Sequence, residues 1–171
     1  MEFNELVKAR RSIRSFMTKN VEEDKLMKVL NAVNRAPSAG NLQAYHIHLV
    51  KTPEIKEQLQ IACADQEFIT QAPFVLIFSA DKATASSKYE ERGEDLYSIQ
   101  DATIAATYAV LAAADVGLGS VWVGAFDPLE VSRLINLDSE MVPVAVIPIG
   151  YPAEDPAETK RKSVLKMVTE V

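Results

Sequence analysis

Residues 96–116 constrain this chain most, because they contain no glycine or proline and carry apolar side chains on nearly every side of a helix. A helix that is apolar all round is normally buried. We therefore expect it at the centre of the fold, where its many alanines let another helix approach closely. Its most apolar part, residues 102–114, is too short to span a bilayer of roughly 30 Å. We expect no membrane partner.

The rest of the chain predicts shorter helices and about four strands. Apolar residues over positions 22–35 recur at the spacing of an amphipathic helix. Short helices are also expected at residues 2–9, 53–62 and 128–135, with Asp127 as the cap of the last one. Strands are expected at residues 45–50, 74–80, 120–126 and 142–150, and the continuous apolar run at 74–80 suggests a strand covered on both faces. Together these elements predict an α+β fold, a sheet covered by helices, as one domain over residues 1–171.

The segment of residues 79–95 has Tyr89 as its only large apolar residue. We expect it to be an exposed loop and a candidate lid. The motif GLGS at residues 117–120 lacks the third glycine of a dinucleotide fingerprint. It is interpreted as the end of the long helix, where glycine permits the turn into a strand.

The charge and cysteine content exclude some classes of function. A formal net charge of −6 argues against nucleic acid as the main partner, because that affinity comes from many Lys and Arg side chains on phosphates. One cysteine, Cys63, cannot form an intramolecular disulfide, which suits a reducing compartment. The first residues lack the apolar core of a signal peptide. We therefore expect a cytoplasmic protein.

Three polar features are candidates for binding. Arg10, Arg11 and Arg14 surround Ser12, and guanidinium groups with a hydroxyl suit a phosphate. The loop APSAGNLQ offers side-chain amides that donate and accept, and a basic tail occupies residues 160–162. Each feature taken alone is also compatible with ordinary solvated surface.

Metal and covalent catalysis have little support. His46 and His48 fall on one face of a predicted strand, but no third metal ligand accompanies them. We expect them to form local hydrogen bonds. Cys63 has no convincing base partner and is interpreted as a packing residue. No metal site and no catalytic side chain are assigned.

In this order and spacing, the motifs resemble the nitroreductase family of FMN-dependent flavoproteins. The resemblance lies in RRSIRSF, in APSAGNLQAYHIHLV, in QDATIAATYAVLAAADVGLGSVWVGAFD and in IPIGYP followed by KRKSV, which run nearly from end to end. It implies a mixed or antiparallel sheet sandwiched by helices in an intertwined homodimer. Two FMN molecules would bind at the subunit interface, each touching both chains.

Carried over by position, the resemblance assigns the binding residues. Arg10 and Ser12 would hold the FMN phosphate with Arg11 beside them, and Arg161, with Lys160 as the weaker candidate, would close that site. Arg14 would lie near N1 and O2 of the ring, where a cation favours the reduced flavin. The other chain would contribute Pro37, Ser38, Ala39, Asn41 and Gln43. Val123, Gly124 and Ala125 would pass along the ring and offer a backbone N–H to N5, and Gln66 is a further candidate.

The implied function is that of an NAD(P)H oxidoreductase with ping-pong kinetics. NADH or NADPH would pass hydride to flavin N5, and a nitroaromatic, a quinone or a flavin would then accept the electrons. One alternative keeps the fold and FMN but changes the reaction to flavin fragmentation or reductive dehalogenation. Another is a flavin-binding protein without turnover. The sequence distinguishes neither the natural acceptor nor the preferred nicotinamide donor.

Overall fold

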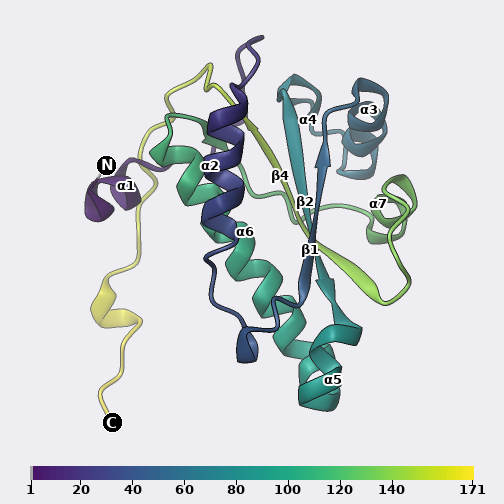
Figure 1. Cartoon of the computed structure of the whole chain (residues 1–171). Helices are drawn as coiled ribbons and strands as arrows, with labels where there is room; N and C mark the ends of the chain where they lie inside the picture. Colours follow the sequence, from purple (N-terminus) through teal and green to yellow (C-terminus); the bar gives the residue numbers. More distant parts are fainter. Residues whose placement is uncertain (1) are drawn as a thin grey trace.

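The computed structural model describes residues 2–171, and a four-stranded antiparallel sheet forms its centre. Its strands are β1 (Tyr45–Val50), β2 (Phe74–Asp81), β3 (Gly119–Ser120) and β4 (Met141–Gly150), in the order β1-β2-β4-β3. Helices cover both faces of this sheet (Figure 1). The α+β prediction is therefore confirmed.

The long helix α6 (Ser98–Asp115) lies along one face of the sheet beside α2 (Glu23–Val33). Both helices contribute to one core cluster with Leu76, Phe78 and Ile147. The buried side of α6 consists largely of alanines that are fully inaccessible, namely Ala102, Ala105, Ala106, Ala109 and Ala113. Small side chains bring the helix axis close to its neighbours, as the sequence predicts.

The opposite face is covered by α3 (Pro53–Ala62), α4 (Phe68–Gln71) and α7 (Pro128–Leu134). Their apolar side chains join the sheet in a second core cluster that includes Leu59, Ile69 and Val131. The predicted cap of α7 is confirmed, since the Asp127 carboxylate accepts hydrogen bonds from the backbone of Leu129 and Glu130 at 2.9 and 3.2 Å.

The two ends of the chain meet beside β3. After α1 (Phe3–Ala9), Ser12 bridges to Ser120 and Phe16 bridges to Pro152. Beyond residue 152 the chain is a largely exposed tail that passes α1 and then extends away from the sheet, with a short 3-10 turn, η3 (Val164–Lys166) (Figure 1). Within residues 2–171, none of the helices combines the length and apolar character that crossing a membrane requires.

The prediction of an open loop at residues 79–95 is wrong. The segment forms α5 (Lys82–Arg92), followed by a π-helical turn, η2 (Gly93–Tyr97), that leads into α6. Asp81 caps α5 by accepting from the Thr84 backbone N–H at 2.9 Å. Small residues hold the segment together, because Gly93 is buried directly against the backbone of Ala85. A search for large apolar residues misses this kind of packing.

The predicted strand at residues 120–126 is also too long. Only Gly119–Ser120 pair as β3, and Val123 then makes an isolated bridge to Val146. The segment leaves the sheet after that bridge. Gly124 and Ala125 are consequently exposed.

Candidate functional site

A cavity of about 560 Å³ lies between the N-terminal segment and the tail. Its lining is cationic, because five of the side chains around it are basic and one is acidic. The cavity residues are Val7, Lys8, Arg10, Arg11, Ser12, Arg14, Pro156, Ala157, Glu158, Thr159 and Arg161. The structure therefore brings the predicted arginine cluster and Arg161, which is distant in sequence, to one place; we call it the arginine cavity.

The local fold explains why the arginines face this cavity. Ile13 and Phe16 are buried, with 6% of each side chain exposed. The backbone between them is fixed because Ile13 N–H donates to the Ser120 carbonyl at 3.0 Å. With these apolar residues turned inward, the neighbouring Arg14 is left to point outward. On the other side, Ser15 O accepts from the Ala153 N–H at 2.9 Å, so backbone bonds on both sides of Arg14 fix this short segment.

The guanidinium groups of the arginine cavity differ in what they bind. Arg11 is held in place, since its Nη1 donates to the carbonyl of Arg10 at 3.1 Å and to that of Lys8, and its Nη2 lies 3.8 Å from Glu158. Among residues 2–171, the side chains of Arg10, Arg14 and Arg161 have no ion-pair or hydrogen-bond partner. Several unpaired cations in one concave site are suited to bind a multiply charged anion.

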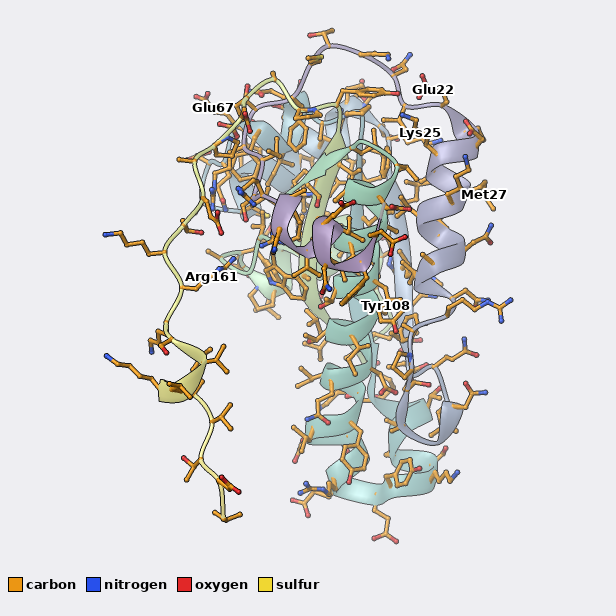
Figure 2. All side chains as sticks on the ribbon, turned by 90° about the vertical axis from the view of Figure 1, so that its left-hand side faces the viewer. Glu22, Lys25, Met27, Glu67, Tyr108 and Arg161 are labelled. Carbon is orange, nitrogen blue, oxygen red and sulfur yellow. The ribbon has the colours of Figure 1, made fainter. Side chains whose placement is uncertain are left out.

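Figure 2 shows Arg161 on the extended tail, with its side chain directed back toward the body of the protein. Lys160, the weaker candidate, does not line the arginine cavity. Sequence reasoning missed Lys8 and Glu158, which do line it. Lys8 is a basic residue two positions before Arg10, and this closeness to the arginine cluster was the signal available for it.

The second predicted group, residues 37–43, lies in a different place. Ala39 N–H donates to the Asp101 carboxylate at 2.9 Å, and the Ser38 hydroxyl accepts from Gln43 N–H at 3.0 Å. Asn41 has a positive φ of 58°, a strained conformation for a residue with a side chain. Pro37, Ser38 and Ala39 line a cavity of about 540 Å³ together with the start of α6.

Asp101 is a site residue that sequence reasoning did not identify. It is 2% exposed, and its second carboxylate oxygen is buried without a hydrogen-bond partner among the described residues. A buried acid at the start of an otherwise apolar helix was the available signal. The Asp101 charge, after burial, contributes to raising the pKa of Tyr45.

The two predicted groups stand at opposite ends of α6. The loop at residues 37–43 is bonded to Asp101 near its start, whereas the arginine segment is bonded to Ser120 just beyond its end. Fourteen residues of helix separate Asp101 from Asp115, or about 21 Å at 1.5 Å per residue. Within one chain the two groups are therefore separated by most of the length of α6.

The third predicted group contains free backbone donors. Val123 N–H is already bonded to the Val146 carbonyl at 3.0 Å. Within the described part of the chain, the N–H groups of Gly124 and Ala125 have no such partner. Gln66 supports this segment, since its side-chain amide donates to Cys63 O at 2.7 Å and to Ala125 O at 3.5 Å.

The histidines and the cysteine behave as buried or edge groups. His46 and His48 contact each other edge to face, with ring centroids 4.6 Å apart. His48 Nδ1 is buried and has no hydrogen-bond partner among residues 2–171. The hydrogen bonding expected for His48 is therefore missing at that atom. Burial, and then the neighbouring His46, lower the pKa of His48. Burial raises the pKa of Cys63 to about 12, which keeps the thiol protonated and agrees with a packing role. Over residues 2–171, no three His, Cys, Asp or Glu side chains gather closely enough to hold a metal ion.

Known proteins resemble the chain in sequence and fold. The sequence model of the protein family described as "Nitroreductase family" matches residues 7–67 and 60–151 of this chain. NADH dehydrogenase of Thermus thermophilus is 33% identical over 173 residues, covering 85% of this chain and 84% of the relative. FMN reductase [NAD(P)H] of Bacillus subtilis is 32% identical over 174 residues, which cover 92% of this chain and 70% of the relative. The solved structure of B. megaterium NfrA2 matches with a TM-score of 0.90 at 29% identity, covering 97% of this chain and 72% of that one.

Proposed function

This chain belongs to the nitroreductase family, and we propose that it is an FMN-dependent oxidoreductase that takes hydride from NADH or NADPH. The family match confirms the resemblance that the sequence motifs indicated. When bound, FMN supplies the chemistry, because its N5 accepts hydride from the donor and passes it to a second substrate.

The arginine cavity is the observation that supports a phosphate-bearing cofactor. Arg10 and Arg161 bring unpaired guanidinium groups to one concave surface, and Ser12 adds a hydroxyl. These groups match the donors that a phosphate accepts from. In the proposal Arg10, Ser12 and Arg161 hold the phosphate, Arg11 lies beside them, and Lys160 remains a peripheral candidate.

Arg14 has a different role in the proposal. Its guanidinium has no partner among the described residues, although its backbone N–H is fixed by the Glu154 carboxylate. A fixed cation stabilises negative charge that develops on the pyrimidine part of the ring. Gly124 and Ala125 supply the free N–H groups for the N5 side, and Val123 supports them from the sheet.

The separation of the two groups along α6 supports a homodimer. A ligand in the arginine cavity would reach residues such as Pro37, Ser38, Ala39, Asn41 and Gln43 only from a second copy. The outward side of α6 suits that role, because Ile99 is 41% exposed and Tyr108, which Figure 2 labels, contributes to an apolar hollow with Phe3 and Leu111. In the proposal two chains pack through α6, each completing the other's site.

The exposed tail is the second element that a partner would cover. Val164, Leu165 and Met167 are between 62% and 89% exposed, and apolar residues so exposed often mark an interface. We place the dimer in the cytoplasm, as expected for a chain with one buried cysteine. In the proposal, residues 1–171 of each copy form a single domain.

The experiment that tests the phosphate assignment compares Arg10→Ala with Arg133→Ala. Arg133 is an exposed arginine on α7, far from the cavity lining, and pairs with Glu130. Losing a hydrogen bond to a charged group costs about 1.5–3 kcal/mol. FMN should therefore bind about 10- to 150-fold more weakly to Arg10→Ala, by flavin fluorescence. Riboflavin, which has no phosphate, should bind both variants equally.

Two results would count against the proposal. If Arg10→Ala keeps the parental FMN affinity, the phosphate assignment is wrong. If the FMN-loaded protein keeps an oxidised flavin spectrum under anaerobic NADH and NADPH, a binding role without turnover is favoured instead. Bleaching followed by recovery with a quinone or a nitroaromatic supports the oxidoreductase.

A further inference from the structure

Glu158 is the one acidic side chain among the residues that line the arginine cavity. Its carboxylate lies 3.8 Å from Nη2 of Arg11, with 72% of the glutamate side chain and 25% of the arginine side chain exposed. The glutamate comes from the tail, whereas Arg11 follows α1. The tail therefore brings a negative charge to the place where the proposed cofactor needs positive charge.

The contact with Glu158 limits which nitrogens of Arg11 are available to a ligand. Its Nη1 is occupied by two backbone carbonyls, those of Lys8 and Arg10. The remaining terminal nitrogen, Nη2, faces Glu158. An anion that enters the cavity and uses this nitrogen has to displace the carboxylate or share the cation with it.

We propose that Glu158 is an internal counter-ion of Arg11 that competes with the phosphate of FMN and so limits how tightly the cavity holds phosphate-bearing ligands. This inference rests on the proposed function, because it assigns the cavity to a phosphate. The exposed pair is weak enough to exchange, since ion pairs of this kind contribute little to stability. Glu158 thereby lowers the preference for FMN over riboflavin without touching the ring.

The position of Arg161 gives the exchange a structural consequence. Glu158 and Arg161 line the same cavity from the same tail segment. With no anion present, the Glu158–Arg11 pair is the ion pair between this segment and the residues that follow α1. With a phosphate present, Arg161 replaces that contact by binding the phosphate, so the segment stays in place while its charges exchange roles.

The test is the affinity of Glu158→Gln for FMN and for riboflavin, measured by flavin fluorescence. Glu170→Gln is the matched control, because it makes the same change in net charge at an exposed tail position that does not line the cavity. FMN should bind Glu158→Gln about two- to fivefold more tightly than the parent, the scale of an exposed ion pair. Riboflavin affinity should not change, and added salt should reduce the FMN difference.

Equal FMN affinities in Glu158→Gln and the parent, or equal gains for FMN and riboflavin, would overturn the inference. A second measurement keeps it separate from the proposed function. Inorganic phosphate should raise the thermal midpoint of Glu158→Gln more than that of the parent. If no flavin binds but this difference is seen, the proposed cofactor fails and the Glu158 competition stands; if flavin binds and neither difference is seen, the competition fails alone.

Discussion

Replacing Gly93 with alanine should destabilise the protein, although helix propensity alone predicts the opposite. Gly93 follows α5 with ordinary helical dihedral angles, φ −65° and ψ −48°. Alanine adopts these angles more readily than glycine, with a gain of up to about 1 kcal/mol in a helix. The backbone conformation therefore gives no reason for a glycine here.

The reason is the space around the missing Cβ atom. A Cβ at position 93 would meet the carbonyl oxygen of Ala85, would lie 2.7 Å from the carbonyl carbon, and would lie 2.9 Å from Tyr89 Cβ. The two nearest atoms are backbone, so no side-chain rotation relieves the overlap. Overpacking of this kind costs about 1–3 kcal/mol, and more when the neighbours are rigid. Because the overlap is with rigid backbone, we place the cost at about 2–3 kcal/mol, and after the propensity gain we expect a net loss of about 1–2 kcal/mol.

The assay is thermal and urea unfolding at one protomer concentration, because unfolding of an oligomer depends on concentration. For a chain of this size the expected loss lowers the midpoint by about 2–8 °C. Gly117→Ala is the comparison, since its φ of +78° imposes strain while nothing lies within 4 Å of the new Cβ. An unchanged or raised midpoint for Gly93→Ala would refute the close packing of α5 against η2.

Two further substitutions test buried polar groups. Burial lowers the pKa of His48 below its ordinary 6.5, so the unfolded chain takes up the proton first as pH falls. The unfolding free energy should drop as pH falls below 6.5, and His48→Gln should reduce that slope in urea titrations; an equal slope would contradict the assignment. Lys56→Met leaves the carbonyls of Ala72 and Thr70, bonded at 2.7 and 3.2 Å, without their donor. It should cost about 1–3 kcal/mol by urea unfolding, whereas Lys51→Met, at an exposed lysine, should cost little.

The elements that the sequence predicts well carry their signal in neighbouring residues. The predicted strand at residues 45–50 coincides with β1, and the predicted helix at 53–62 coincides with α3. A short run of β-favouring residues ended by a turn defines β1, and Pro53 at the first helical position defines α3. No long-range information is needed for either.

The errors occur where stability comes from contacts between distant or small residues. The helix α5 contains few large apolar side chains, and its packing depends on Ala85 and Gly93 approaching each other. Propensity and periodicity do not register a contact between two small residues. The predicted strand extends too far beyond Ser120 for a related reason. Its true length depends on pairing with β4, which is distant in the sequence.

The candidate site divides in the same way. The residue types of the arginine cluster predict an anion site, and the structure joins Arg161 to it from the far end of the chain. Nothing local in the sequence marks Glu158 as the counter-charge of Arg11, because the pair depends on where the tail crosses the cavity. The tail contains several acidic residues, and only its place in the folded chain distinguishes Glu158 from the others.

The geometry of α6 links the fold to the proposed function through one contact near each end of the helix. At its start, the buried Asp101 fixes the loop at residues 37–43 by accepting from Ala39. Beyond its end, Gly119 lets Ile13 approach so closely that a Cβ would lie 2.7 Å from Ile13 Cγ1, and Ile13 carries the arginine segment. Because a helix is a rigid spacer, these two contacts fix the distance between the groups that two copies would have to share. In the proposed homodimer, the length of α6 therefore limits which residues of a second copy could reach each arginine cavity.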